Sequence, residues 1–60
     1  MTQKQLFAAV RDLGMSIKKD EAGDYVVNHP RGSEGTAYFT TDRDDALGTA
    51  KLMKEGATNA

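Results

Sequence analysis

Apolar residues at helical spacing predict a helix at the start of the chain. They recur at intervals of three and four residues, as on one buried face, and they are Leu6, Ala9, Val10 and Leu13. Thr2 and Gln5 have the spacing of a capping box, in which two side chains bond the backbone N–H groups of the first turn. Gly14 follows and can adopt the left-handed conformation that ends helices. We therefore predict a helix over residues 3–13.

The same periodicity predicts a second helix near the other end of the chain, running to about Glu55. Its apolar positions are Ala46, Leu47, Ala50 and Met53, with Leu52 at the margin. Thr41 is expected to cap this helix, with Asp44 at the capping-box position. Gly56 is expected to end it. Gly48 inside the helix costs about 1 kcal/mol relative to alanine, and a close approach of the helix to the sheet would explain its presence.

Three shorter segments between the helices have the patterns of strands. Residues 15–19 alternate in side-chain character, and residues 25–28 follow a turn in which Gly23 can adopt a positive φ. Residues 36–40 are rich in β-branched and aromatic side chains, which favour strands. The segment 29–35 contains the only proline of the chain, which cannot continue a central ladder, so we predict a loop there.

These elements predict an α+β domain in the order α-β-β-β-α, with a three-stranded antiparallel sheet and both helices packed on one face. The side chains expected between the helices and the sheet are Leu6, Val10, Leu13, Met15, Ile17, Tyr25, Val27, Ala37, Phe39, Leu47, Ala50 and Met53. The open face is expected to carry Ser16, Lys18, Val26, Asn28, Thr36, Tyr38 and Thr40. A slip of one residue in the second strand would instead bring Tyr25 and Val27 to the open face. We assign residues 1–56 to one domain and residues 57–60 to a flexible C-terminal tail.

The composition limits the class of protein. Sixty residues make one small domain, and without cysteine it can form neither disulfides nor thiolate metal sites. No apolar run approaches the ~20 residues of a membrane span, and charges from Lys4 onward interrupt any signal-peptide core. We expect a cytoplasmic protein that needs no cofactor and binds no membrane. The net charge of −1 counts against strong nucleic-acid binding, which needs a basic excess.

No group of residues predicts a catalytic or metal site. His29 is the only histidine, so we interpret it as a residue of a surface loop instead of a ligand or a catalytic base. Asp42, Asp44 and Asp45 lack the spacing of a calcium loop and are better explained as charges at a helix N-terminus. Residues 32–35 could bind an anion through backbone N–H groups, but neither a P-loop lysine nor a dinucleotide motif follows. We expect a flexible connector there, and no enzyme activity.

The open face of the predicted sheet is the strongest candidate for a binding surface. Lys18, Val26 and Tyr38 would place a cation, an aliphatic and an aromatic side chain together, and tyrosine is a common anchor at interfaces. Arg31 in the neighbouring loop could pair with a carboxylate or a phosphate of a partner. A second interpretation stays open, in which Val26 and Tyr38 are ordinary strand residues and Arg31 is simply solvated.

Three segments of the chain carry a resemblance to other proteins. They are Tyr25-Val26-Val27-Asn28, the run from Arg31 to Thr40, and Asp44-Asp45-Ala46-Leu47-Gly48-Thr49-Ala50. They resemble a group of short uncharacterised proteins encoded by phages and prophages. Gly35 and Phe39 depart from that pattern, in which an alanine and a second tyrosine are common. The resemblance implies an accessory gene of a mobile element and supplies no activity.

The α-β-β-β-α order is also similar to that of double-stranded RNA-binding domains. In that family a lysine-rich start of the last helix meets phosphates of the RNA. The matching segment here is Asp42-Arg43-Asp44-Asp45, which would place three carboxylates against the RNA backbone. The resemblance therefore implies the topology of that family without its binding chemistry.

Taken together, the residues favour a small non-enzymatic protein–protein interaction module, a phage or mobile-element accessory protein that modulates a host protein. Its partner would be an unidentified host or phage protein, and a homodimer is also possible. The alternative is a weak or accessory nucleic-acid-binding protein that uses Lys18, Lys19, Arg31 and Tyr38. An acidic mimic of nucleic acid is disfavoured, because a net charge of −1 gives only a weak field.

Overall fold

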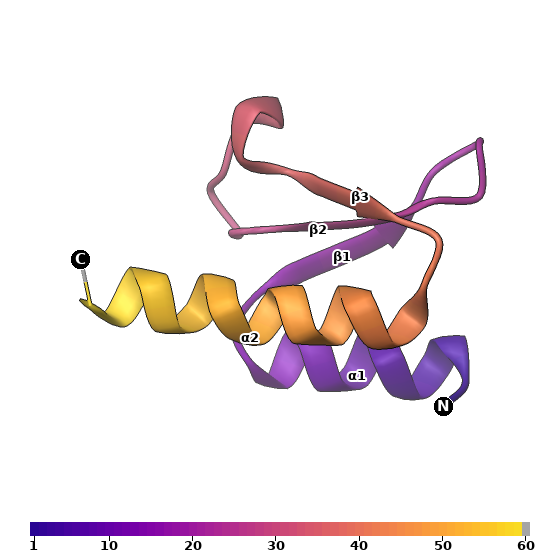
Figure 1. Ribbon diagram of the computed structural model, residues 1–60, viewed down its shortest axis with the longest axis horizontal. Coiled ribbons are helices and arrows are strands. Elements are labelled where there is room, and N and C mark those ends of the chain that lie inside the picture. Colours follow the sequence, from indigo (N-terminus) through magenta and orange to yellow (C-terminus); the bar gives the residue numbers. More distant parts are fainter. Residues whose placement is uncertain (60) are drawn as a thin grey trace.

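The helices and strands follow one another in the predicted order. The computed structural model describes residues 1–59, without the side chains of residues 34 and 57–59. Its elements are α1 (Gln3–Asp12), β1 (Ser16–Lys19), β2 (Tyr25–Asn28), the 3₁₀ turn η1 (Glu34–Thr36), β3 (Tyr38–Thr40) and α2 (Arg43–Asn59). The strands form one antiparallel sheet in the order β1-β2-β3. Both helices lie on the same side of this sheet, α1 against β1 and α2 against β2 and β3, which confirms the α+β prediction (Figure 1).

The ends of α1 confirm the predicted helix signals. The Thr2 hydroxyl accepts a hydrogen bond from the Gln5 backbone N–H at 3.1 Å, and the Gln5 side chain accepts one from the Thr2 N–H at 2.9 Å. Gly14 follows the helix with a φ of +82°, and Gly23 adopts +90° in the turn between β1 and β2. Both positions need a backbone conformation that residues with a Cβ rarely adopt.

The start of α2 differs from the prediction by one residue. The Asp42 carboxylate accepts hydrogen bonds from the backbone N–H groups of Asp44, at 2.8 Å, and Asp45, at 3.2 Å. Asp42 therefore caps the helix, and the expectation that Thr41 would do so was wrong. Aspartate and threonine are both good N-caps, so the two adjacent candidates could not be separated by residue type.

Two expectations about glycines in α2 were also wrong. The helix continues through Gly56 to Asn59, because a glycine only weakens a helix and no proline follows it. A Cβ added at Gly48 would meet nothing within 4 Å, so no close approach to the sheet explains that residue. The flexibility predicted for residues 57–60 stays a prediction, and residue 60 lies outside the described part of the chain.

The hairpin of β1 and β2 has the predicted register. Ile17 lies opposite Val27 and Lys18 lies opposite Val26, so the apolar pair faces the helices and the second pair faces away from them. The turn is closed by a hydrogen bond from the Asp20 backbone N–H to the Asp24 carbonyl, at 2.9 Å.

Strand β3 has the opposite orientation to the predicted one. Phe39 lies opposite Val26 on the open face and is 53% exposed, whereas Tyr38 lies opposite Val27 on the helix side. The expectations that Phe39 is buried and that Tyr38 faces outward were wrong. The Tyr38 hydroxyl donates to the Asp45 carboxylate at 2.6 Å, so the tyrosine meets α2 and keeps a polar partner. Thr36 belongs to η1, not to the strand.

The core lies between the helices and the sheet. Its buried side chains are Leu6, Val10, Ile17, Tyr25, Val27, Ala46 and Ala50, and the partly buried Phe7, Leu13, Met15, Leu47 and Met53 pack against them. Tyr25 meets Phe7 edge to face at 6.3 Å, and its hydroxyl accepts a hydrogen bond from Arg43 Nε at 2.9 Å. Leu52 points away from the core and is 69% exposed. Neither described helix combines the length and apolar character needed to cross a bilayer.

Candidate functional site

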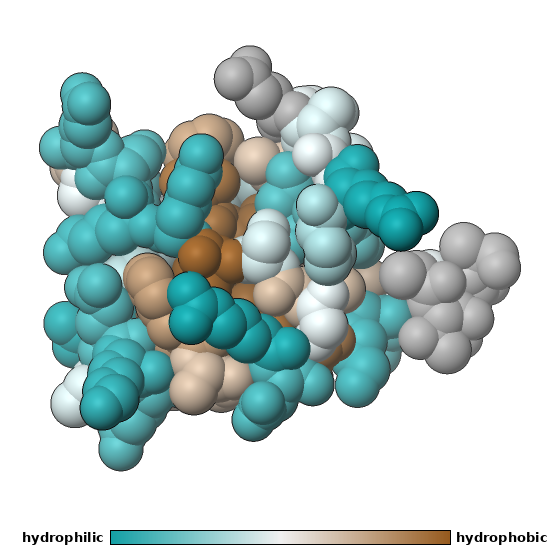
Figure 2. All heavy atoms as spheres, turned by 180° about the vertical axis from the view of Figure 1, so that it is seen from behind, coloured by the Kyte–Doolittle hydropathy of each residue, from teal (hydrophilic) through white to brown (hydrophobic). Residues whose placement is uncertain are grey.

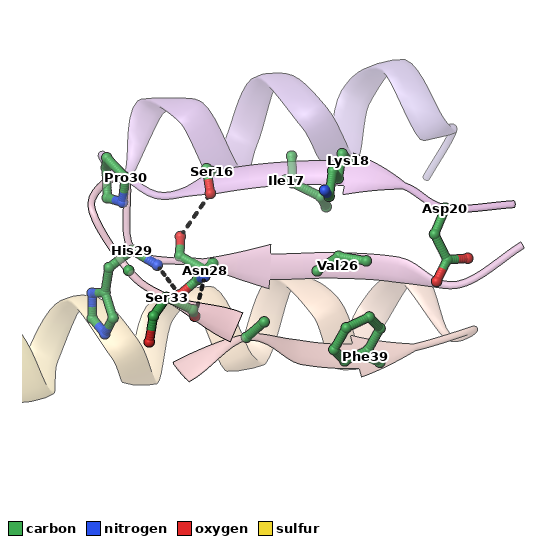
Figure 3. A pocket seen from close by; sticks show the side chains of 12 residues that line it. Ser16, Ile17, Lys18, Asp20, Val26, Asn28, His29, Pro30, Ser33 and Phe39 are labelled. Carbon is green, nitrogen blue, oxygen red and sulfur yellow. Dashed lines mark hydrogen bonds between the residues drawn. The ribbon is translucent and has the colours of Figure 1, made fainter. Parts of the chain in front are cut away.

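The open face of the sheet carries a hollow of about 500 Å³. One side chain from each strand crosses it: Lys18 of β1, Val26 of β2 and Phe39 of β3 lie side by side, with both helices behind the sheet (Figure 3). We call these three residues the cross-strand row. The end of the hollow nearest the loop after β2 is lined by Ser16, Asn28, His29, Pro30, Gly32 and Ser33.

Val26 forms an apolar floor although no helix covers it. It is only 6% exposed, because Lys18 and Phe39 flank it on the neighbouring strands. Phe39, in contrast, keeps more than half of its surface exposed. Seen from behind, the hydrophobic residues of the molecule gather near the middle of the view and hydrophilic residues surround them (Figure 2). Because the Phe39 ring is more than half exposed beside Val26, the row presents apolar surface that the fold itself does not cover.

The side chain of Asn28 organises the loop that bounds the hollow. Its Oδ1 accepts hydrogen bonds from the Thr36 hydroxyl at 2.7 Å and from the His29 backbone N–H at 2.8 Å. Its Nδ2 donates to the Ser33 carbonyl at 3.0 Å. A Cβ at Gly32 would overlap the Asn28 side chain and lie 2.5 Å from the Thr36 hydroxyl oxygen, so the loop packs tightly at this point. These bonds join the two ends of the loop between β2 and β3, and the flexible connector expected at residues 32–35 stays a prediction.

Lys18 supplies the positive charge of the hollow. Its side chain is exposed and forms no ion pair or hydrogen bond with the described residues. Asp20 lines the same hollow, but its carboxylate accepts a hydrogen bond from the Asp24 backbone N–H at 2.8 Å. His29 contributes to the wall and is half-buried. The cation on this face is therefore available to a ligand.

Only two of the four predicted binding residues meet in this hollow. Lys18 and Val26 are cross-strand neighbours, as expected. Arg31 is exposed in the loop but does not line the hollow, and Tyr38 lies on the other face of the sheet. Phe39 takes the place expected for Tyr38. The Tyr38 hydroxyl finds its polar partner in Asp45, seven residues later, and this bond of the folded chain places the tyrosine on the helix side.

The hydrogen bond between Tyr38 and Asp45 joins β3 to α2. Together with a weaker contribution from Thr40, it holds the pKa of the Asp45 carboxyl below its usual value of 3.8. The same bond raises the pKa of the Tyr38 hydroxyl above 10.0, since the neighbouring carboxylate disfavours the phenolate. Lys19 also faces the helix side, with its ammonium 5.6 Å from the centre of the Tyr25 ring. Tyr38 and Lys19 are thus engaged within the fold.

The described residues contain no group of three or more histidine, cysteine, aspartate and glutamate side chains placed to hold a metal ion. In comparisons with protein-family models, with curated proteins and with solved structures, the chain matches none. The chemistry of the hollow is therefore our guide to function. It combines an apolar floor, an exposed aromatic ring and one available cation.

Proposed function

We propose that this protein is a small protein–protein interaction module that binds its partner through the open face of the sheet. The observation that supports the proposal is the cross-strand row, in which the largely exposed Phe39 and the available Lys18 flank the apolar floor at Val26. Aromatic side chains beside a desolvated apolar centre are the usual anchors of protein interfaces. No enzymatic step is part of this proposal.

The row also favours a partner of particular chemistry. A segment that brings an apolar side chain to Val26 and Phe39 would desolvate the floor, and a carboxylate on it would pair with Lys18. The resemblance to short phage and prophage proteins supports a more specific version, in which the module is an accessory protein that modulates a host protein in the cytoplasm.

Capture from host lysate, read by mass spectrometry, tests the proposal. The Lys18→Glu variant reverses the charge on the row, and Lys4→Glu makes the same change on the exposed start of α1. We expect one protein to be retained by the wild type and by Lys4→Glu, and lost by Lys18→Glu. Equal retention by both variants would remove the open face from consideration.

A second candidate function is weak binding of single-stranded nucleic acid. The observation in its favour is Phe39, since an exposed ring beside a lysine on a sheet can stack with a base. Against it, Lys19 and Tyr38 are engaged with Tyr25 and Asp45, and the net charge is −1. This candidate predicts oligonucleotide binding that falls steeply with salt. Captured material that disappears after nuclease treatment would favour it over the protein partner.

A further inference from the structure

The two edges of the sheet differ in how they are protected. Strand β1 carries Lys18 and Lys19, and charged side chains on an edge strand oppose pairing with a like strand. Strand β3 forms the other edge and consists of Tyr38, Phe39 and Thr40, with neither a charge nor a proline. No strand lies outside β3 within the described residues (Figure 1). The edge at β3 is therefore open to pairing in a way that the edge at β1 is not.

The hydrogen-bond pattern identifies the residue of β3 whose backbone N–H and C=O groups point out of the sheet. The Asp20 N–H bonds the Asp24 carbonyl, so this pair is a hydrogen-bonded pair of the antiparallel ladder. Because such pairs alternate, the backbone polar groups of Val26 face β1. Those of Phe39, opposite Val26, therefore face away from β2 and out of the sheet. Phe39 presents both an exposed ring and an unpaired backbone N–H and C=O at the same edge.

We propose that β3 pairs antiparallel with β3 of a second copy of this chain, about a two-fold axis at Phe39. Each Phe39 N–H would then donate to the carbonyl of Phe39 in the other copy, and two three-stranded sheets would become one of six strands. The two rings would meet on the open face as a directly opposed cross-strand pair.

The distribution of charge argues for a second copy as the occupant. A two-fold interface brings each residue near the axis against itself, so it tolerates no unpaired charge there. The cross-strand row would continue through the axis with apolar residues at its centre, and the two Lys18 side chains would lie at its far ends. Asp45, which meets Tyr38 on the helix side of this strand, already accepts a hydrogen bond from the Tyr38 hydroxyl.

This inference goes beyond the proposed function and does not depend on it. A dimer built at β3 would place both hollows on one continuous face, with the Phe39 rings in contact at the axis and Lys18 and Val26 of each copy away from it. Dimerisation is measured on purified protein alone, so its failure and the failure of partner capture are distinct. The Lys18→Glu variant should lose the partner and keep the dimer.

Sedimentation equilibrium over a concentration series tests the dimer. Phe39→Lys introduces a charge at the proposed axis, and Leu52→Lys makes the same kind of change at an exposed residue of α2. We expect Phe39→Lys to weaken dimerisation by about tenfold or more and Leu52→Lys to leave it unchanged. A wild type that stays monomeric at about 1 mM would overturn the proposal. An equal loss in both variants, or a loss only in Leu52→Lys, would overturn it as well.

Amide hydrogen exchange followed by NMR supplies a readout at the backbone. The Phe39 N–H should exchange freely in dilute samples and become protected as the concentration rises. The Val26 N–H, which already faces β1, should show little dependence on concentration. Dimerisation without concentration-dependent protection at Phe39 would show that another surface forms the interface and would overturn the assignment to β3.

Discussion

The two faces of the sheet use neighbouring valines of the same strand in different ways. Val27 faces the helices and is fully buried in the core between them and the sheet. Val26, one residue earlier, is almost as well buried, but it is covered only by the side chains of adjacent strands. The helices thus cover one face of the sheet, whereas on the open face only the central Val26 is buried. This difference separates the surface that stabilises the fold from the surface that we propose for binding.

Truncating the two valines tests this comparison most strongly. We expect Val27→Ala to lower the free energy of unfolding by about 2–3 kcal/mol, because the core around it cannot refill the space. Val26→Ala should cost only about 1 kcal/mol, since the lost methyl groups border solvent. Urea denaturation of both variants measures the difference. Because both are valine-to-alanine changes in the same strand, the loss of β-propensity is the same and cancels in the comparison. Equal costs would contradict the distinction between the faces.

The loop at the end of the hollow gives the next largest effect. Gly32→Ala forces a Cβ against Asn28 and Thr36, and we expect it to cost about 1–2 kcal/mol. Gly35→Ala is the matched control, because its Cβ would meet only the Ser33 hydroxyl oxygen at 3.7 Å. Thermal denaturation of the pair should show destabilisation in the first variant alone. A Gly32→Ala protein as stable as Gly35→Ala would show that the loop does not pack as described.

A change in α2 should act on stability without touching the open face. The Cβ of Gly48→Ala would extend into open space from an exposed position in the interior of α2. We expect a gain of about 1 kcal/mol in the free energy of unfolding, from helix propensity and from a less flexible unfolded chain. Urea denaturation measures it, and partner capture should not change. A loss of stability would mean that this turn contacts something that its open surroundings do not reveal.

The smallest effect concerns the hydrogen bond between β3 and α2. Folding lowers the pKa of the Asp45 carboxyl below its unfolded value of 3.8, so the carboxylate contributes its full stabilisation at pH values above 3.8. This stabilisation is lost as the pH falls through the lower pKa of the folded state. Tyr38→Phe removes the main cause, so the Asp45 pKa should rise towards its usual value, with Thr40 still lowering it in part. An NMR titration of the Asp45 carboxyl follows this shift. An unchanged pKa in Tyr38→Phe would show that the hydrogen bond is not its cause.

The parts of the fold that sequence reasoning predicted correctly are those with two agreeing signals. The capping box at Thr2 and Gln5, the glycines at positions 14 and 23, and the register of Ile17 with Val27 each join a local requirement to the apolar pattern. Such agreement between local and global preferences is what makes an assignment robust.

The register of β3 could not be predicted in the same way. A three-residue edge strand offers Tyr38 and Phe39 at adjacent positions, and either ring suits a buried or an exposed site. The choice is made by the hydroxyl bond to Asp45 and by η1, which withholds Thr36 from the strand. Both depend on tertiary geometry. The sequence therefore predicted the face of the sheet that carries the hollow, together with Lys18 and Val26. It did not predict the aromatic residue, and it included Arg31, which does not line the hollow.

The most direct test of the central claim measures stability and partner capture together for Phe39→Ala, with Leu52→Ala as the control. Both remove a large exposed apolar side chain, and only Phe39 belongs to the cross-strand row. We predict that Phe39→Ala stays folded, with a free energy of unfolding lower by about 1–2 kcal/mol because Val26 loses part of its cover, and that it loses the captured protein, whereas Leu52→Ala retains it. Retention of the captured protein by a folded Phe39→Ala protein would contradict the account.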